Sequence, residues 1–310
     1  MIAIHSMRTD RIRPALESLG GPAMIQPMLK IMGLSACTIK QHFSKLVLLT
    51  DDAGAEMARK CKFPYSEILS VGKNFDSDAC FWTHSKFIAY ANQQPFVHFD
   101  NDVFLWEPLP ARLMEAEVFA SNSETARWQN YSKYIKNLEQ SIGLEGLHKK
   151  HFTNRMPINM SILGGNNFKA LNLFSSYVTD FIKVNKGFYD LTSEQKNCLM
   201  QGMHVVEQLW GSCFIQNELD IKIELALSED MLIGNEPSPD VKITHLHGIK
   251  QLAQNNPADS NIRDLFTKVN ARLLDIAPEV ALAIVDYGMV FDSQIGTNND
   301  SNLTAEATHS

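Results

Sequence analysis

An acidic turn interrupts an apolar run, "PFVHFDNDVF", at residues 95–104. Large apolar side chains on both sides of the turn predict a buried segment. Asp100 and Asp102 are like charges, and burying them is costly unless a positive group meets them. The run therefore predicts a buried strand that ends at a cation site.

Short β-type runs alternate with longer helical patterns, which is typical of an α/β domain with a substantially parallel sheet. The expected strands lie at residues 1–6, 45–52, 95–102, 116–121, 157–167, 220–227 and 241–248. The expected helices lie at residues 22–43, 53–62, 78–93, 167–184, 192–217 and 261–274. A further apolar helix or strand is expected near residues 280–291.

These elements are expected to form one main domain over residues 1–292. Residues 123–156 are rich in polar, aromatic and basic side chains and are interpreted as a helical insertion that covers the site. Trp128, Tyr131 and Tyr134 in this insertion would stack on a ring of a ligand, close over a ligand or form the surface of a helical cap. Residues 293–310 lack apolar periodicity and are expected to be a disordered tail.

The charge balance excludes one large class of partner. The chain has 28 Lys and Arg residues against 35 Asp and Glu residues, a net charge of −7. No stretch concentrates basic residues, so we expect no nucleic-acid partner.

The cysteines and the apolar runs indicate the cellular compartment of the protein. The five cysteines are scattered and show no CxxC spacing, which fits reduced thiols rather than disulfides or a zinc site. The N-terminus turns polar by His5, and no run of about 18 apolar residues exists. We therefore expect a cytoplasmic protein with no transmembrane segment.

The position of the acidic turn suggests its chemistry. Ligands of open α/β sheets gather at the carboxyl ends of strands. Mg²⁺ or Mn²⁺ is commonly held there by one or two carboxylates together with substrate phosphates. The alternative is a polar β-turn whose Asp and Asn residues make only local hydrogen bonds.

The longer stretch "PFVHFDNDVFLWEPL" resembles the DxD segment of GT-A-fold glycosyltransferases. Four further segments occur in the order found in the family-8 type, which includes glycogenin and the lipopolysaccharide hexosyltransferases. The resemblance implies a GT-A-like, Rossmann-related mixed sheet flanked by helices. It also implies metal-dependent transfer of a hexose from a nucleoside diphosphate sugar, with UDP as the expected nucleotide, to a glycan, lipid-linked or protein acceptor.

The resemblance assigns the metal ligands. Asp100 and Asp102 would bind Mn²⁺ or Mg²⁺ with His245 of "ITHLHGIKQ", or with His247, which shares a face with His245 in an extended strand. In the same segment the family pattern would place Gly248 and Lys250 at the diphosphate. Lys250 comes one residue early, and no Pro-Trp pair follows.

The resemblance also assigns residues to the donor sugar. Lys86, fourteen positions before Asp100, would contact the donor phosphate or sugar, unless it is a solvated helix lysine. The segment "INMSILGGNN" would face the donor sugar through Asn159, Gly164 and Gly165, although the glycine pair also fits a plain turn.

The nucleotide itself would lie near the first two strands and the acidic turn. The implied base and ribose contacts are His5, Ser6, Asp51 and the turn residues Asp100 and Asn101.

The segment "VVEQLWGSCF" resembles the part of the family that meets the acceptor and the reactive face of the sugar. It puts Glu207 and Gln208 forward as catalytic residues, against the alternative of a Glu on a helix surface. Glu207 as a base favours inversion of the anomeric centre. The Gln208 position resembles retaining enzymes, so the stereochemical outcome stays open.

Two other functions compete with sugar transfer. A metal-dependent phosphohydrolase also uses Asp, His and a divalent cation, but normally with more Asp and His clusters than this chain shows. A protein that binds nucleotide sugars without turnover is the second alternative, because the acceptor and late His segments depart from the family pattern.

Overall fold

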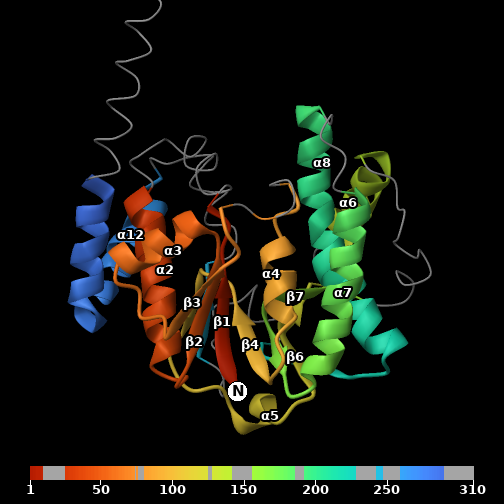
Figure 1. Cartoon of the computed structure of the whole chain (residues 1–310), viewed down its shortest axis with the longest axis horizontal. Coiled ribbons are helices and arrows are strands. Elements are labelled where there is room, and N and C mark those ends of the chain that lie inside the picture. Colours follow the sequence, from red (N-terminus) through yellow and green to blue (C-terminus); the bar gives the residue numbers. More distant parts are fainter. Residues whose placement is uncertain are drawn as a thin grey trace, which may run out of the picture.

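The computed structural model describes residues 1–9, 25–73, 75, 80–124, 128–141, 156–185, 192–227, 242–246 and 259–289. These residues form a single α/β domain with a seven-stranded mixed sheet flanked by helices (Figure 1). The strand order is β3-β2-β1-β4-β7-β6-β8. The strands are β1 (Ile2–Ser6), β2 (Leu46–Thr50), β3 (Glu67–Ser70), β4 (Phe96–Phe99), β6 (Val118–Ser123), β7 (Ile158–Gly165) and β8 (Ile223–Leu225).

Strand direction fixes which residues share an edge of the sheet. β1 runs parallel to β2 and β4, β2 to β3, and β6 to β8. β7 runs antiparallel to its neighbours β4 and β6. The residues that follow β1, β2, β4 and β6 therefore lie at one edge, the carboxyl edge, where ligands of such sheets bind. A second sheet pairs β5 (Val103–Leu105) with β9 (Ile243–His245).

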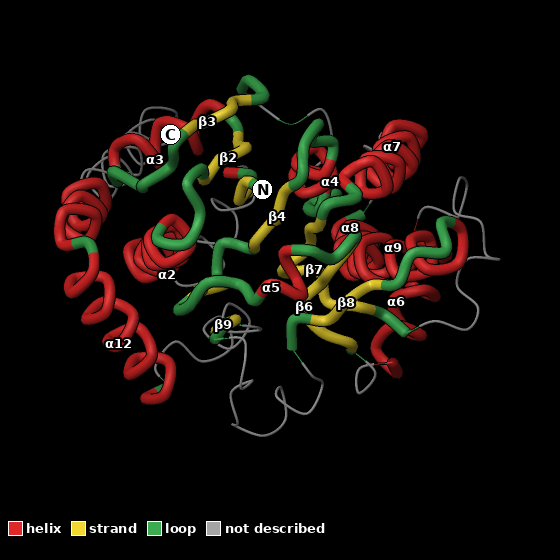
Figure 2. The backbone as a smooth tube through the Cα atoms, turned by 90° about the horizontal axis from the view of Figure 1, so that it is seen from below, coloured by secondary structure: helices red, strands yellow, loops and turns green. Residues whose placement is uncertain are grey.

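Helices cover both faces of the sheet (Figure 2). On one face lie α2 (Ile25–Lys40), α3 (Asp52–Lys60), α12 (Ser260–Ile276) and the helix at residues 278–289. On the other face lie α4 (His84–Tyr90), α6 (Trp128–Ser141), α7 (Phe168–Asn185) and the long helix that contains η4. A short helix, α5 (Ala111–Met114), lies at the opposite edge of the sheet.

The strands alternate between these two layers. Ile4 of β1 packs against the α4–α7 side, whereas Ala3 packs against the α2 side. Val47 and Leu46 of β2 divide in the same way. Because both faces are covered, β1, β2 and β4 are buried along their whole length, as their continuous apolar sequences require.

One long helix combines α8 (Ser193–His204), η4 (Val205–Trp210), α9 (Gly211–Cys213) and η5 (Phe214–Glu218). Thr192 and Gln195 begin it with a capping box in which each side chain bonds the backbone N–H of the other. η4 and η5 are π-helical, and such segments are rare and often occur at functional sites. η4 carries Glu207 and Gln208, both buried.

The expected α/β class, with a mixed sheet flanked by helices in a single domain, is confirmed, with local differences. The predicted helix at 78–93 is too long: among the described residues 80–93, only α4 is helical. Residues 278–289 form a helix rather than a strand. β3 was not predicted, because its sequence "EILS" is half exposed and has no clear alternation. α6 lies within the predicted insertion but packs along α8 and contributes Tyr131 and Leu138 to the main core. The predicted tail lies outside the described residues.

Within the described part of the chain, no helix combines the length and apolar character needed to cross a bilayer.

Two buried histidines, on the inner strands β1 and β4, should make stability depend on pH. Burial lowers the pKa of His5 to about 3, although the charge of Asp102 opposes the shift. Burial, with the charges of Lys86 and His5, also holds the pKa of His98 well below its usual value. The unfolded state therefore binds more protons than the native state below pH 6.5, so stability falls as the pH drops through that value.

We expect the free energy of unfolding, measured with urea, to fall by about 1–2 kcal/mol more in wild type than in His98→Gln between pH 7.5 and 5. Glutamine cannot take up the proton that the unfolded His98 binds. Equal pH slopes for the two proteins would contradict a neutral buried His98.

Candidate metal centre

The acidic turn follows β4 directly and is held by backbone bonds. Asp100 donates its N–H to the carbonyl of Ser161 in β7 at 2.7 Å, and Val103 donates to the carbonyl of Asp100 at 3.1 Å. The Asn101 side chain donates to the carbonyl of Ser6 at 2.9 Å, which ties the turn to the end of β1. Asn101 therefore shapes the turn, and the two aspartates lie at the carboxyl edge of the sheet.

β9 brings His245 to these aspartates. In the antiparallel β5–β9 pair, His245 lies opposite Val103, and Leu246 donates its N–H to the carbonyl of Asp102 at 3.1 Å. His245 Nε2 lies 3.7 Å from Asp102 Oδ1. One ligand atom from each of Asp100, Asp102 and His245 lies within 4.8 Å of the others.

The donor set and its surroundings fit a hard divalent cation. The two carboxylates suit Mn²⁺ or Mg²⁺, the imidazole offers a third ligand, and three protein ligands leave positions for phosphate oxygens or water. Asp102 is buried, while Asp100 and His245 are partly exposed, so the group is open on one side. The predicted alternative ligand His247 lies outside the described residues, as do Gly248 and Lys250.

Trp106 fixes the position of the strand that carries His245. Its backbone N–H donates to the carbonyl of Lys242, and its indole N–H donates to Thr244 Oγ1, both at 2.9 Å. The guanidinium of Arg272 in α12 lies 5.5 Å from the centre of the Trp106 ring. Trp106 therefore links α12 to the strand that carries His245.

Removing this indole bond should weaken metal binding without touching a ligand. We expect Trp106→Phe to lower Mn²⁺ affinity by about 10-fold, the lower end of the range for residues that orient metal ligands. Thr244→Val removes the same bond from its other side, so the double variant should lose no more than either single variant. Titration with Mn²⁺ by calorimetry measures all three. Additive losses would show that the two side chains act separately.

Lys86 joins Asp100 to Glu207 in a buried ion network. Its ammonium lies 2.7 Å from Asp100 Oδ1 and 2.7 Å from Glu207 Oε1. Burial disfavours the charged ammonium, but the two carboxylates and their hydrogen bonds outweigh that effect and raise the pKa of Lys86. Lys86 is therefore not a solvated helix lysine, and Glu207, which is 0% exposed, is not a surface residue.

The carboxylate of Glu207 is harder to ionise than usual. Burial raises its pKa to about 7, against the opposing effect of Lys86, and the charge of Asp100 adds to the rise. Lys86 is shared between two carboxylates, so its effect on Glu207 does not outweigh burial, and the pKa values of Lys86 and Glu207 both lie above their usual range.

A second polar network lies beside the first. The Asn159 side chain donates to Glu124 Oε1 at 2.7 Å, and Tyr131 donates its hydroxyl to Glu124 Oε2 at 2.6 Å. The Tyr131 hydroxyl also contacts Gln208 Oε1. The structure thus brings the predicted residues Asn159 and Gln208 to one place. Glu124 was not predicted as a site residue. The signal that could have found it is its position directly after β6, at the carboxyl edge of the sheet.

The predicted glycine pair lies at the other edge of the sheet. Gly164 pairs with Val97 and Gly165 with Phe96, at the start of β4. A Cβ on Gly164 would lie 2.3 Å from the carbonyl oxygen of Phe96, and one on Gly165 would lie 2.1 Å from that of Glu117. The described structure therefore explains both glycines by close backbone packing, and not by contact with a ligand at the acidic turn.

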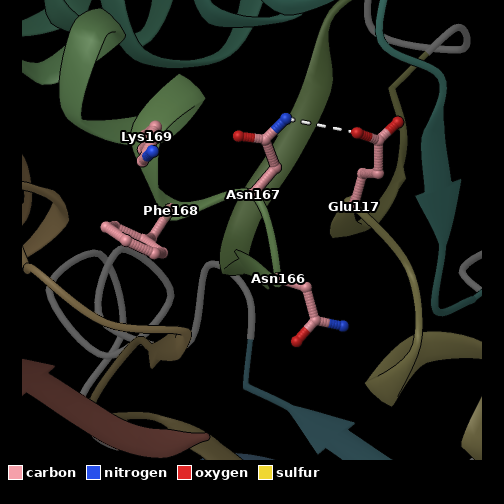
Figure 3. A pocket seen from close by; sticks show the side chains of 5 residues that line it. All are labelled: Glu117, Asn166, Asn167, Phe168 and Lys169. Carbon is pink, nitrogen blue, oxygen red and sulfur yellow. Dashed lines mark hydrogen bonds between the residues drawn. The ribbon is translucent and has the colours of Figure 1, made fainter.

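A shallow hollow opens just beyond Gly165, at that same opposite edge (Figure 3). The Asn167 side chain donates to Glu117 across it at 3.2 Å. Its lining residues are Glu117, Asn166, Asn167, Phe168 and Lys169. This hollow is separate from the metal centre.

The predicted nucleotide contacts near β1 and β2 are engaged within the protein. His5 is fully buried and bonds the Tyr65 hydroxyl at 2.9 Å, and Ser6 bonds His98 at 2.9 Å. Asp51 is the N-cap of α3 and accepts hydrogen bonds from Gly54 N–H, Thr9 N–H and the Thr9 hydroxyl. All three lie at the carboxyl edge, where their side chains already stabilise the fold.

Comparison with known proteins places the chain in a family. A family model described as "Family of unknown function (DUF6734)" matches residues 1–269, which include the whole candidate metal centre. No curated protein matches the chain. The protein therefore belongs to the DUF6734 family.

Proposed function

We propose that this protein is a metal-dependent glycosyltransferase that moves a hexose from a nucleoside diphosphate sugar, with UDP as the expected nucleotide, to an acceptor hydroxyl. The observation that carries the proposal is the convergence of Asp100, Asp102 and His245 at the carboxyl edge of the sheet. These are the residues that the GT-A resemblance selects as metal ligands. The mixed sheet, in which β7 alone is reversed, agrees with the fold that the resemblance implies.

The charge of the centre favours a divalent cation. Asp100, Asp102 and Glu207 contribute three carboxylates, and Lys86 is the ammonium that pairs with two of them. Fully ionised, these four groups sum to −2. A divalent cation would bring that sum to zero.

Unpaired polar atoms are buried around the acidic turn. Within the described part of the chain, Glu207 Oε2, Asn101 Oδ1 and Ser161 Oγ are buried and have no hydrogen-bond partner. Buried polar atoms normally find one. Asn101 lies within the acidic turn, Ser161 bonds its backbone, and Glu207 shares Lys86 with Asp100. All three atoms are enclosed, so their unmet bonding capacity indicates polar surroundings that a plain surface β-turn would not need, rather than direct contacts for a ligand.

The chain's own residues would divide the work of transfer. Asp100, Asp102 and His245 would hold the cation, which supplies charge stabilisation for the leaving diphosphate. Lys86 adds a fixed positive charge next to Asp100. Such a charge stabilises the transition state most when it lies where negative charge develops. Glu207 is fully enclosed, so it holds and orients the Lys86 ammonium rather than contacting the acceptor hydroxyl.

Incubation of the protein with Mn²⁺ and a panel of nucleotide sugars tests the proposal. We expect release of free nucleoside diphosphate that requires Mn²⁺ and stops with a chelator. Release of inorganic phosphate instead would identify a phosphohydrolase. Metal-dependent stabilisation by the nucleotide sugar with no product would identify a binding protein.

A further inference from the structure

Three aromatic rings from distant parts of the sequence contact one another beside the candidate centre, one pair edge to face and one pair stacked. Trp82 precedes α4, Tyr134 lies on α6, and His204 ends α8. The rings of Trp82 and His204 are 5.0 Å apart with an interplanar angle of 62°, and those of Tyr134 and His204 are 5.7 Å apart at 26°. All three side chains are partly exposed. We call this group the aromatic platform.

The aromatic platform lies next to Lys86 and is held rigidly. The Lys86 ammonium is 5.4 Å from the centre of the Trp82 ring. The Trp82 indole N–H donates to the carbonyl of Met200 in α8 at 2.9 Å. Tyr134 contacts Tyr131 edge to face at 5.9 Å, and Tyr131 bonds Glu124 in the second polar network. Both sides of the platform are therefore tied to the buried groups around the candidate centre.

A pair of amides continues the surface. Asn137 follows Tyr134 by almost one turn of α6, and Gln201 precedes His204 by almost one turn of α8. The Asn137 side chain donates to Gln201 Oε1 at 2.9 Å, on a partly exposed surface. This bond uses one donor and one acceptor, and each amide carries others. α6 and α8 lie side by side where these residues occur (Figure 1).

We propose that the aromatic platform binds a carbohydrate, the acceptor of the transfer reaction. A sugar ring presents an apolar C–H face that packs on aromatic rings and hydroxyl groups that bond to amides, and the platform with the Asn137–Gln201 pair offers both. The proposal rests on the proposed function, because the distance to Lys86 places the bound sugar beside the donor site. It selects a glycan or sugar-bearing acceptor over an unmodified protein.

Two matched tyrosine variants test the aromatic platform. Tyr134→Leu removes a ring from the platform, and Tyr177→Leu makes the same change on α7, where Tyr177 is 49% exposed. Saturation-transfer NMR with lactose, maltose and methyl glucoside measures saccharide binding, and calorimetry measures UDP binding with Mn²⁺. We expect at least one saccharide to bind wild type, with affinity lowered about 5-fold by Tyr134→Leu and unchanged by Tyr177→Leu. UDP affinity should stay within about twofold in both variants.

Asn137→Ala gives a second test at a site where folding is not at risk, and it should also weaken saccharide binding. Failure of all three saccharides to bind, or equal affinities for wild type and Tyr134→Leu, would overturn the proposal. A loss of UDP affinity in Tyr134→Leu with saccharide binding unchanged would show that the platform holds a nucleobase. If wild type binds a saccharide but no UDP, the result would support the aromatic platform as a saccharide site and would refute the proposed transferase function.

Discussion

Replacing Asp102 with asparagine is expected to lower the Mn²⁺-dependent affinity for UDP by at least about 100-fold. Asp102 is buried, and its carboxylate lies 3.7 Å from the imidazole of His245. Asparagine has the same shape but no negative charge, so it removes a ligand charge while it preserves packing. Calorimetric titration with UDP, in the presence and absence of Mn²⁺, measures the loss.

The exposed residue Asp180 gives a matched control. Asp180→Asn makes the same chemical change at an ion pair with Lys183 on the surface of α7. Exposed ion pairs of this kind contribute little to the free energy of unfolding. Both variants should unfold in urea within about 1 kcal/mol of wild type, because the substitution is isosteric. A soluble Asp102→Asn protein that binds UDP with Mn²⁺ as wild type does would remove the metal centre from the proposal.

The acidic turn could be predicted from sequence because its signal is local. Asp100 and Asp102 come directly after the apolar strand β4. A few adjacent residues are enough to predict both the strand and the turn. The approach of His245 to Asp102 depends on the register of β5 against β9, which are far apart in the chain. Only the resemblance to a known family supplied that pairing, and the β5–β9 ladder now gives it a physical basis.

The roles of other predicted site residues could not be read from the sequence, because the type of a residue does not show what it contacts in the fold. In sequence, Gly164 and Gly165 fit a ligand loop and a tight strand contact equally well. In the structure, the backbones of β4 and β6 lie too close to these glycines to leave room for a Cβ, so the strand contact explains them. Glu207 reads as a helix-surface residue until the π-helical segment η4 is seen to bury it. Its partner Lys86 lies on another helix, so this ion pair has no sequence signature.

Replacing Lys86 with methionine is expected to destabilise the protein by about 3–5 kcal/mol, because it leaves the carboxylates of Asp100 and Glu207 without their buried partner. Methionine keeps much of the apolar length of the side chain, so lost charge rather than lost volume dominates. Urea unfolding at neutral pH measures the change.

A double-mutant cycle then separates the charge from the packing. Glu207→Gln in the Lys86→Met background removes one unpaired carboxylate, so the double variant should be more stable than Lys86→Met alone. Mn²⁺ should stabilise Lys86→Met more than wild type, because a cation held by Asp100 replaces part of the missing positive charge. Additive effects of the two substitutions would show that Lys86 and Glu207 do not form a coupled pair. Equal Mn²⁺ stabilisation in both proteins would show that the cation site and the Lys86 network are electrostatically independent, and Lys86 could then not act on a diphosphate at the metal.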